Sequence, residues 1–193
     1  MFLNCHSYYS LRYGTMAPET LVQRAVELGI KTLALTDINN TSGTFDFVKA
    51  CREHDIQPIV GMEFRNNNQL LYTALAFNTN GFEEINRFFT RHSLSQQPLP
   101  LQPPPFDHCA KVFPFSQVTP QQLRDNEYAG IRVVELNRLI ASDFRYHQHK
   151  LLVWQPITFN DRAGYELHKH LRAIDRNTLL GMVQPTDCAA YYE

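Results

Sequence analysis

The chain has 193 residues, of which 44% are hydrophobic and 19% are charged, a balance that suits one globular domain with a substantial core. Its 18 basic and 19 acidic residues give a formal net charge of -1, which excludes the global positive field of many nucleic-acid-binding domains. No apolar run could span a membrane, and the N-terminus lacks the basic start and apolar core of a signal peptide. We therefore expect a cytoplasmic location.

The cysteines Cys5, Cys51, Cys109 and Cys188 are scattered along the chain and form no CxxC pair. In a cytosolic protein this spacing predicts reduced, mostly buried thiols and does not favour a four-cysteine zinc site. Cys51 and Cys109 are candidate nucleophiles by residue type. Nothing near them in the sequence would lower a thiol pKa, so we favour core thiols.

The first third of the chain alternates between short apolar runs and helical patterns. The pattern predicts strands at 2–5, 31–36 and 58–61. It predicts helices from 16–20 to Gly29, where Pro18 suits the first turn, and from Thr44 to His54. Strands that alternate with helices across short links indicate parallel βαβ units.

The middle of the chain begins with an Asn66–Asn68 turn, a strand over 70–77 and a helix over 81–92. A proline-rich stretch follows at about 95–106, which excludes helix and central strand. It could be a ligand for an SH3-type domain, but we favour a stiff connector.

Further strands are expected at 111–115, 131–134 and 151–154, with a helix start at 119–122 and a short helix at 136–140. Asn160 or Asp161 should cap a helix that runs to about Ile174. Residues 179–193 are weakly patterned and end without a capped element, as if cut from a longer protein. About seven strands, most followed by helices, indicate a small or incomplete α/β barrel.

Three strands end at a residue that can bind a metal ion. His6 follows the opening strand, Asp37 follows the apolar run TLALT, and Glu63 ends IVGME. The carboxyl ends of parallel strands form the edge where ligands collect in α/β folds. One histidine and two carboxylates there are typical of a site with nitrogen and oxygen ligands.

These motifs resemble one family. The stretches CHSYYSLRYG, LALTDINNTSG and PIVGMEF are similar, in this order, to the polymerase-and-histidinol-phosphatase (PHP) domain that opens the alpha subunit of bacterial DNA polymerase III. ALAFNTNGFEEIN, LLVWQPITF and ELHKHLRAIDRNTLL resemble its later strands and helices, and the proline-rich middle does not match. The resemblance implies a distorted seven-stranded (β/α) barrel, in full or shortened form. Active members bind two or three metal ions and hydrolyse phosphoesters, some as proofreading exonucleases.

Most of the family's metal ligands have no counterpart in this sequence. The opening His-x-His is Asn4-Cys5-His6, the Thr-Asp-His motif is Thr36-Asp37-Ile38, and Glu63 is kept. Other ligand positions hold Tyr13, Leu71 and the segment 155–158. The remaining cleft is therefore His6, Asp37 and Glu63, with His6 and Glu63 as the ligands if any metal ion binds, and we expect no cofactor there.

Other interpretations of these residues stay open at this point. His6 is expected to hydrogen-bond Asp37 or a backbone carbonyl, and strand-end carboxylates commonly organise the adjoining loop and helix. His168 and His170 form a second His-x-His, but on a helix residues i and i+2 point to different faces and cannot chelate together.

Three hypotheses follow for residues 1–193, taken as a single PHP-like domain. The first is the N-terminal fragment of a polymerase III alpha-type subunit with a degenerate metal site, inactive alone, in which nucleotidyl transfer belongs to the parent. Its partners would be the rest of that subunit, a proofreading exonuclease, and DNA through the parent enzyme. The second is an active phosphoesterase or 3′–5′ exonuclease with Zn, Mn or Mg at a reduced site. The third is a stand-alone interaction module.

Overall fold

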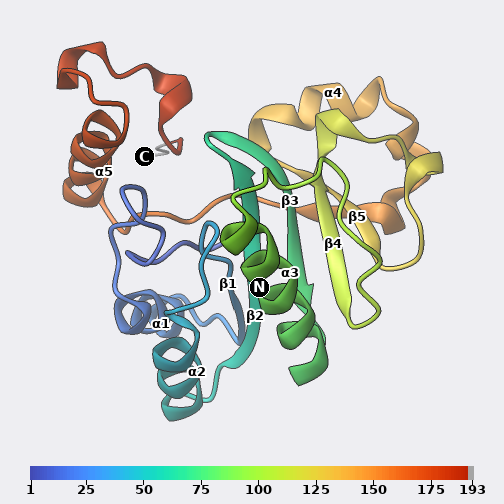
Figure 1. Ribbon diagram of the computed structural model, residues 1–193, viewed down its shortest axis with the longest axis horizontal. Coiled ribbons are helices and arrows are strands. Elements are labelled where there is room, and N and C mark those ends of the chain that lie inside the picture. The colour runs from blue at the N-terminus through green and yellow to red at the C-terminus, as the bar shows by residue number, and fades with distance from the viewer. Residues whose placement is uncertain (191–193) are drawn as a thin grey trace. The chain divides into compact units, whose positions relative to one another are not determined.

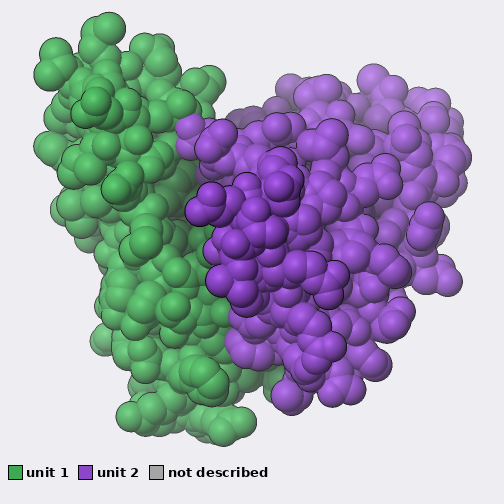
Figure 2. Space-filling model, viewed as in Figure 1, with its two compact units in different colours: residues 1–58, 156–193 green, residues 59–155 purple. Residues whose placement is uncertain are grey.

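The computed structural model describes residues 1–190, and Figure 1 shows their helices and strands. The chain forms two compact units (Figure 2). Unit 1 comprises residues 1–58 together with the chain from Pro156 onward, and unit 2 comprises Ile59–Gln155. Among the residues described, no helix has the length and apolar character needed to cross a membrane.

Among the residues described, unit 1 contains three α-helices and one short strand. They are α1 (Pro18–Glu27), β1 (Thr32–Leu35), α2 (Thr44–Glu53) and α5 (Arg162–Asp175). All four were predicted to within a few residues. The predicted opening strand is reduced to two isolated parallel bridges, which join Phe2 to Leu33 and Cys5 to Ile157.

The helices of unit 1 follow from local sequence signals. Pro18 stands in the first turn of α1, and Leu21, Val22 and Ala25 form its buried face. The side chain of Asp161 caps α5 by accepting a hydrogen bond of 2.8 Å from the backbone N–H of Gly164, as predicted. Gly29 follows α1 with a φ of 66°, the left-handed conformation that ends many helices.

Unit 2 holds most of the β-structure. Its elements are β2 (Gln57–Asn66), which begins two residues before the unit, β3 (Gln69–Ala76), α3 (Thr79–Ser95), β4 (Cys109–Pro114), β5 (Glu127–Ile131), α4 (Leu136–Ile140) and β6 (Leu151–Val153). Within unit 2, the strands hydrogen-bond in the order β2-β3-β4-β5-β6. The α/β class is thus confirmed, with six strands in the described chain where about seven were expected.

Strand direction changes within unit 2. β2, β3 and β4 pair antiparallel, whereas β4, β5 and β6 pair parallel. The turn after Asn66 explains the first pair, because Asn67 adopts a φ of 52° and a two-residue turn can join only antiparallel strands. The sheet is therefore mixed.

The predicted strand at 131–134 begins and ends earlier in the structure. β5 covers Glu127–Ile131, and a 3₁₀ turn occupies Val133–Glu135. The backbone N–H of Arg132 donates to the carboxylate of Glu135, which also pairs with the Arg132 guanidinium at 3.1 Å. This contact closes the turn. The hydrophobic periodicity that predicted the strand does not reveal a capping contact of this kind.

Residues 96–108 form neither helix nor strand, and both ends of this segment are anchored within unit 2. Asn66 exchanges two hydrogen bonds with the backbone of Leu99, at 2.8 and 2.9 Å. Phe106 packs edge-on against Phe88 of α3 in a core that also contains Phe64. The prolines between Leu99 and Phe106 therefore lie in a segment that is held at both ends.

A buried ion pair joins β4 to β5. The ammonium of Lys111 lies 2.8 Å from Oε1 of Glu127, and both residues are less than a tenth exposed. Burial alone would raise the pKa of Glu127. The hydrogen bonds from Lys111 and from the backbone N–H of Arg124 outweigh that effect, so the pKa lies below its ordinary value.

We expect this pair to make the protein sensitive to acid. A carboxylate with a lowered pKa in the folded state contributes stability that is present above its unfolded pKa and is lost as the pH falls through the folded pKa. The Glu127→Gln variant should therefore be less stable than the parent at neutral pH, and the difference should shrink on acidification. Urea denaturation at a series of pH values measures this, and a constant difference across the series would contradict it.

Candidate functional site

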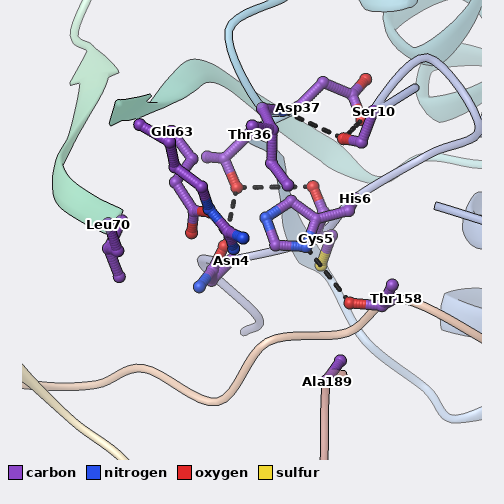
Figure 3. A network of polar contacts seen from close by, with 12 residues as sticks. Asn4, Cys5, His6, Ser10, Thr36, Asp37, Glu63, Leu70, Thr158 and Ala189 are labelled. Carbon is purple, nitrogen blue, oxygen red and sulfur yellow. Dashed lines mark hydrogen bonds and ion pairs between the residues drawn. The ribbon is translucent and has the colours of Figure 1, made fainter. Parts of the chain in front are cut away.

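Asp37 lies two residues after the end of β1 and is almost fully buried in unit 1 (Figure 3). Its carboxylate accepts three hydrogen bonds of 2.7 Å, from the backbone N–H of Ser7, the Ser7 hydroxyl and the Ser10 hydroxyl. The Ser10 oxygen also accepts from the backbone N–H of Ile38 at 3.0 Å. Through these hydrogen bonds, Asp37 holds the loop after His6 against the segment that follows β1.

The two serines were not among the residues predicted for the site. Both lie within the quoted stretch CHSYYSLRYG, three residues apart, with the first directly after His6. Short hydroxyl side chains in a loop often bond to backbone or carboxylate groups nearby, so their spacing was a usable signal. The pairing with a residue about thirty positions away was not readable from the sequence.

His6 is fully buried in the same unit. Its Nδ1 lies 3.2 Å from the hydroxyl oxygen of Thr158, and its backbone N–H donates to the carbonyl of Ile157 at 2.8 Å. The ring also meets Tyr13 edge-on, with 5.5 Å between ring centroids. Figure 3 shows His6 and Thr158 turned toward each other. The segment 155–158, which aligns with the closing ligand motif of the family, thus supplies a hydroxyl group to His6.

A second buried histidine reinforces unit 1. Nδ1 of His168 lies 2.6 Å from the carbonyl oxygen of Tyr13, and its Nε2 accepts from the backbone N–H of Ala189 at 3.0 Å. An imidazole in these two contacts is neutral, with its proton on Nδ1. The Arg172 guanidinium lies 5.2 Å from the Tyr13 ring centroid, one turn further along α5. A structural role for His168 or Arg172 was not predicted from the sequence, although these two residues share a helix face.

His170 lies on another face of α5, as the helical spacing predicted. It is exposed, and its Nδ1 lies 2.8 Å from the carbonyl oxygen of Glu166. His168, in contrast, is fully buried. The second His-x-His of the sequence is therefore divided between a buried and an exposed position.

Glu63 lies in unit 2, in the middle of β2, and its side chain is 1% exposed. Arg65, two residues on, places Nε and a terminal guanidinium nitrogen 2.6 and 2.5 Å from Oε1 of Glu63. Residues i and i+2 of a strand share a face, which allows this contact. The buried carboxylate is therefore charge-compensated by a residue of its own strand. Arg65 was not predicted to take part.

The contacts of these three residues bear on whether they fit a metal ion. Within residues 1–190, no group of three or more histidine, cysteine, aspartate or glutamate side chains is arranged to hold one. An ion bound by Asp37 would have to displace short hydrogen bonds from Ser7 and Ser10. An ion bound by Glu63 would meet the positive guanidinium of Arg65 at the same oxygen. These local arrangements do not fit a family-type metal centre.

The candidate cysteine nucleophiles are buried. Burial raises the pKa of Cys51 and of Cys109 to about 12, and the neighbouring carboxylate of Glu84 adds to the effect at Cys109. Thiols with such pKa values are protonated at neutral pH, and it is the thiolate that reacts. Both side chains accordingly belong to the core.

Comparison with known proteins places these motifs in a family. The sequence matches the PHP domain over residues 3–144, which is most of the chain. It is 33% identical over 95 residues to the DNA polymerase III subunit alpha of Buchnera aphidicola, covering 46% of this chain and 8% of that protein. It is 36% identical over 96 residues to the error-prone DNA polymerase of Symbiobacterium thermophilum, covering 50% of this chain and 9% of that protein.

Among solved structures, an amidohydrolase from Chromobacterium violaceum is similar with a TM-score of 0.40 and 19% identity, over 49% of this chain and 34% of that one. The chain spans less than a tenth of the length of the curated relatives named above. The match to the family extends across both strand-end motifs of unit 1 and the Glu63 strand of unit 2. The chain belongs to the PHP domain family.

Proposed function

We propose that this chain is the N-terminal PHP domain of a polymerase III alpha-type subunit, with a degenerate metal site and a structural or partner-docking role. The similarity to alpha subunits and to an error-prone polymerase supports the parent. Nucleotidyl transfer would then belong to the parent enzyme, in the cytoplasm, and DNA would be met through it. The docking partners would be the rest of the subunit or a proofreading exonuclease.

One observation carries the proposal. Each of the three retained family positions is engaged by a neighbour from its own unit: His6 by Thr158, Asp37 by two serines, and Glu63 by Arg65. Removing one partner of a buried ion pair such as that of Glu63 costs about 3–5 kcal/mol. A metal ion would have to compensate this cost before it gained any binding energy. The contacts therefore favour a scaffold over a hydrolase.

We expect the purified chain to bind zinc, manganese or magnesium only substoichiometrically after dialysis. It should also hydrolyse a chromogenic phosphomonoester and single-stranded DNA no faster than a His6→Ala control does. Elemental analysis and a hydrolysis assay measure both. Stoichiometric metal, together with hydrolysis that disappears in His6→Ala, would establish the phosphoesterase alternative instead.

The parent enzyme allows a separate test of the scaffold role. A charge-neutral Glu63→Gln/Arg65→Met variant of the whole subunit should retain primer extension at moderate temperature, because it removes both partners of the pair together. Loss of primer extension in that variant, with an unchanged melting temperature, would show that these side chains act in the reaction and would contradict a scaffold role.

A further inference from the structure

A cavity of about 660 Å³ lies within unit 2, and Leu71 is the one position aligned with a family metal ligand among its lining residues. Its volume lies within the range of about 300–1,000 Å³ that is typical of small-molecule sites. β3, β4 and the start of β5 line one side, and the proline-rich segment 101–105 lines another. Nothing in the proposed scaffold role uses this cavity.

Lys111 gives the cavity a buried cationic group. Its side chain is 9% exposed, and among residues 1–190 the one side-chain acceptor it contacts is Oε1 of Glu127 at 2.8 Å. An ammonium group has three N–H donors, so Lys111 can keep its contact with Glu127 and still donate to an acceptor on a ligand in the cavity.

The cavity lining has an excess of positive charge. Lys111 and Arg124 both line it, and Glu127 is the carboxylate among its lining residues. The Glu127 carboxylate is already engaged by Lys111 and by the backbone N–H of Arg124 at 2.9 Å. The Arg124 side chain is exposed, and its positive charge helps to lower the pKa of Glu127. Two cations against one carboxylate leave one positive charge for a ligand to balance.

The rest of the lining is mixed. Leu71 and Phe113 of the strands and Pro103 and Pro104 of the segment 101–105 supply carbon surface. Side-chain amides come from Gln69, Gln102, Gln117 and Gln122. Proline has no backbone N–H, so the proline wall formed by Pro103 and Pro104 offers carbon surface and few donors. The anchors of the segment at Leu99 and Phe106 hold the wall in place, so that a ligand need not order it.

We propose that this cavity binds a small organic anion, a molecule with one acidic group and an apolar face. The acidic group would contact Lys111 and Arg124, and the apolar face would pack against Phe113 and the proline wall. The acid could be a carboxylate or a phosphate ester, and both are acceptors for these donors. The inference does not depend on the identity of the parent enzyme.

The test uses 2-naphthoate as the carboxylate probe, adenosine 5′-monophosphate as the phosphate probe, and 2-naphthalenemethanol as the uncharged analogue of the first. Calorimetric titration should show saturable binding of at least one anion, about tenfold tighter than the alcohol. Which anion binds more tightly identifies the acid. The proposal would be overturned if neither anion bound, or if neither anion bound more tightly than the alcohol.

Variants of the cavity residues test whether the anion binds in this cavity. Arg124→Gln removes an exposed charge and should weaken binding about fivefold without affecting folding. Lys111→Met/Glu127→Gln removes the buried pair as a unit and should weaken it about tenfold or more. Arg91→Gln, an exposed position on α3 outside the cavity, is the matched control and should bind as the parent does. Unchanged affinity in both cavity variants, with unchanged melting curves, would overturn the site.

Discussion

Replacing Gly14 by alanine is expected to destabilise the protein by about 3 kcal/mol or more. A β-carbon at this position would lie 1.8 Å from the carbonyl oxygen of Ser7 and 2.4 Å from its carbonyl carbon. Both are backbone atoms, so no side-chain rotation can relieve the contact. The loop would have to move, and Ser7 would then lose its two hydrogen bonds to Asp37.

Thermal denaturation tests this expectation. For a chain of this size, about 3 kcal/mol corresponds to a fall in Tm of about 6–12 °C. Gly181→Ala is the matched control, because a β-carbon there meets nothing within 4 Å. It should melt with the parent protein. Similar melting of the two variants would show that the loop after His6 is not held in the position described.

Replacing Asp37 by alanine is expected to cost about 3–5 kcal/mol, because the N–H of Ser7 and the hydroxyls of Ser7 and Ser10 would lose a charged acceptor in a buried site. Asp37→Asn should cost only about 1 kcal/mol. Its amide oxygen can keep the two bonds made to Oδ1, and its NH₂ group can donate to the Ser7 hydroxyl, which then acts as acceptor.

Chemical denaturation of the two variants separates a structural carboxylate from a metal ligand. A network of hydrogen bonds depends on shape, so asparagine should substitute well. A metal ligand depends on charge, so asparagine and alanine should both abolish metal binding while changing stability little. Equal destabilisation by asparagine and alanine would mean that the negative charge itself stabilises the loop, contrary to this expectation.

Local signals in the sequence account for most elements. The helix at 136–140 was predicted with the bounds that the structure shows, and Asp161 caps α5 as expected. These elements depend on neighbours within a few residues. β5 was predicted about three residues late, because the run at 131–134 is apolar but Val133 and Val134 lie on an exposed turn. Exposed apolar residues mimic a strand pattern when no partner strand is visible.

The candidate site was likewise predictable from the sequence only in part. The sequence by itself determined the family and the order of the three motifs, and it predicted that Asn4 and Ile38 stand where the family has histidines. Each of these depends only on which residue stands at a position. Only the tertiary structure decided what the retained residues do. Asp37 meets two serines about thirty positions away, and His6 meets Thr158 from the far end of the chain. Such contacts arise from packing between distant segments, and residue type and spacing do not specify which segments meet.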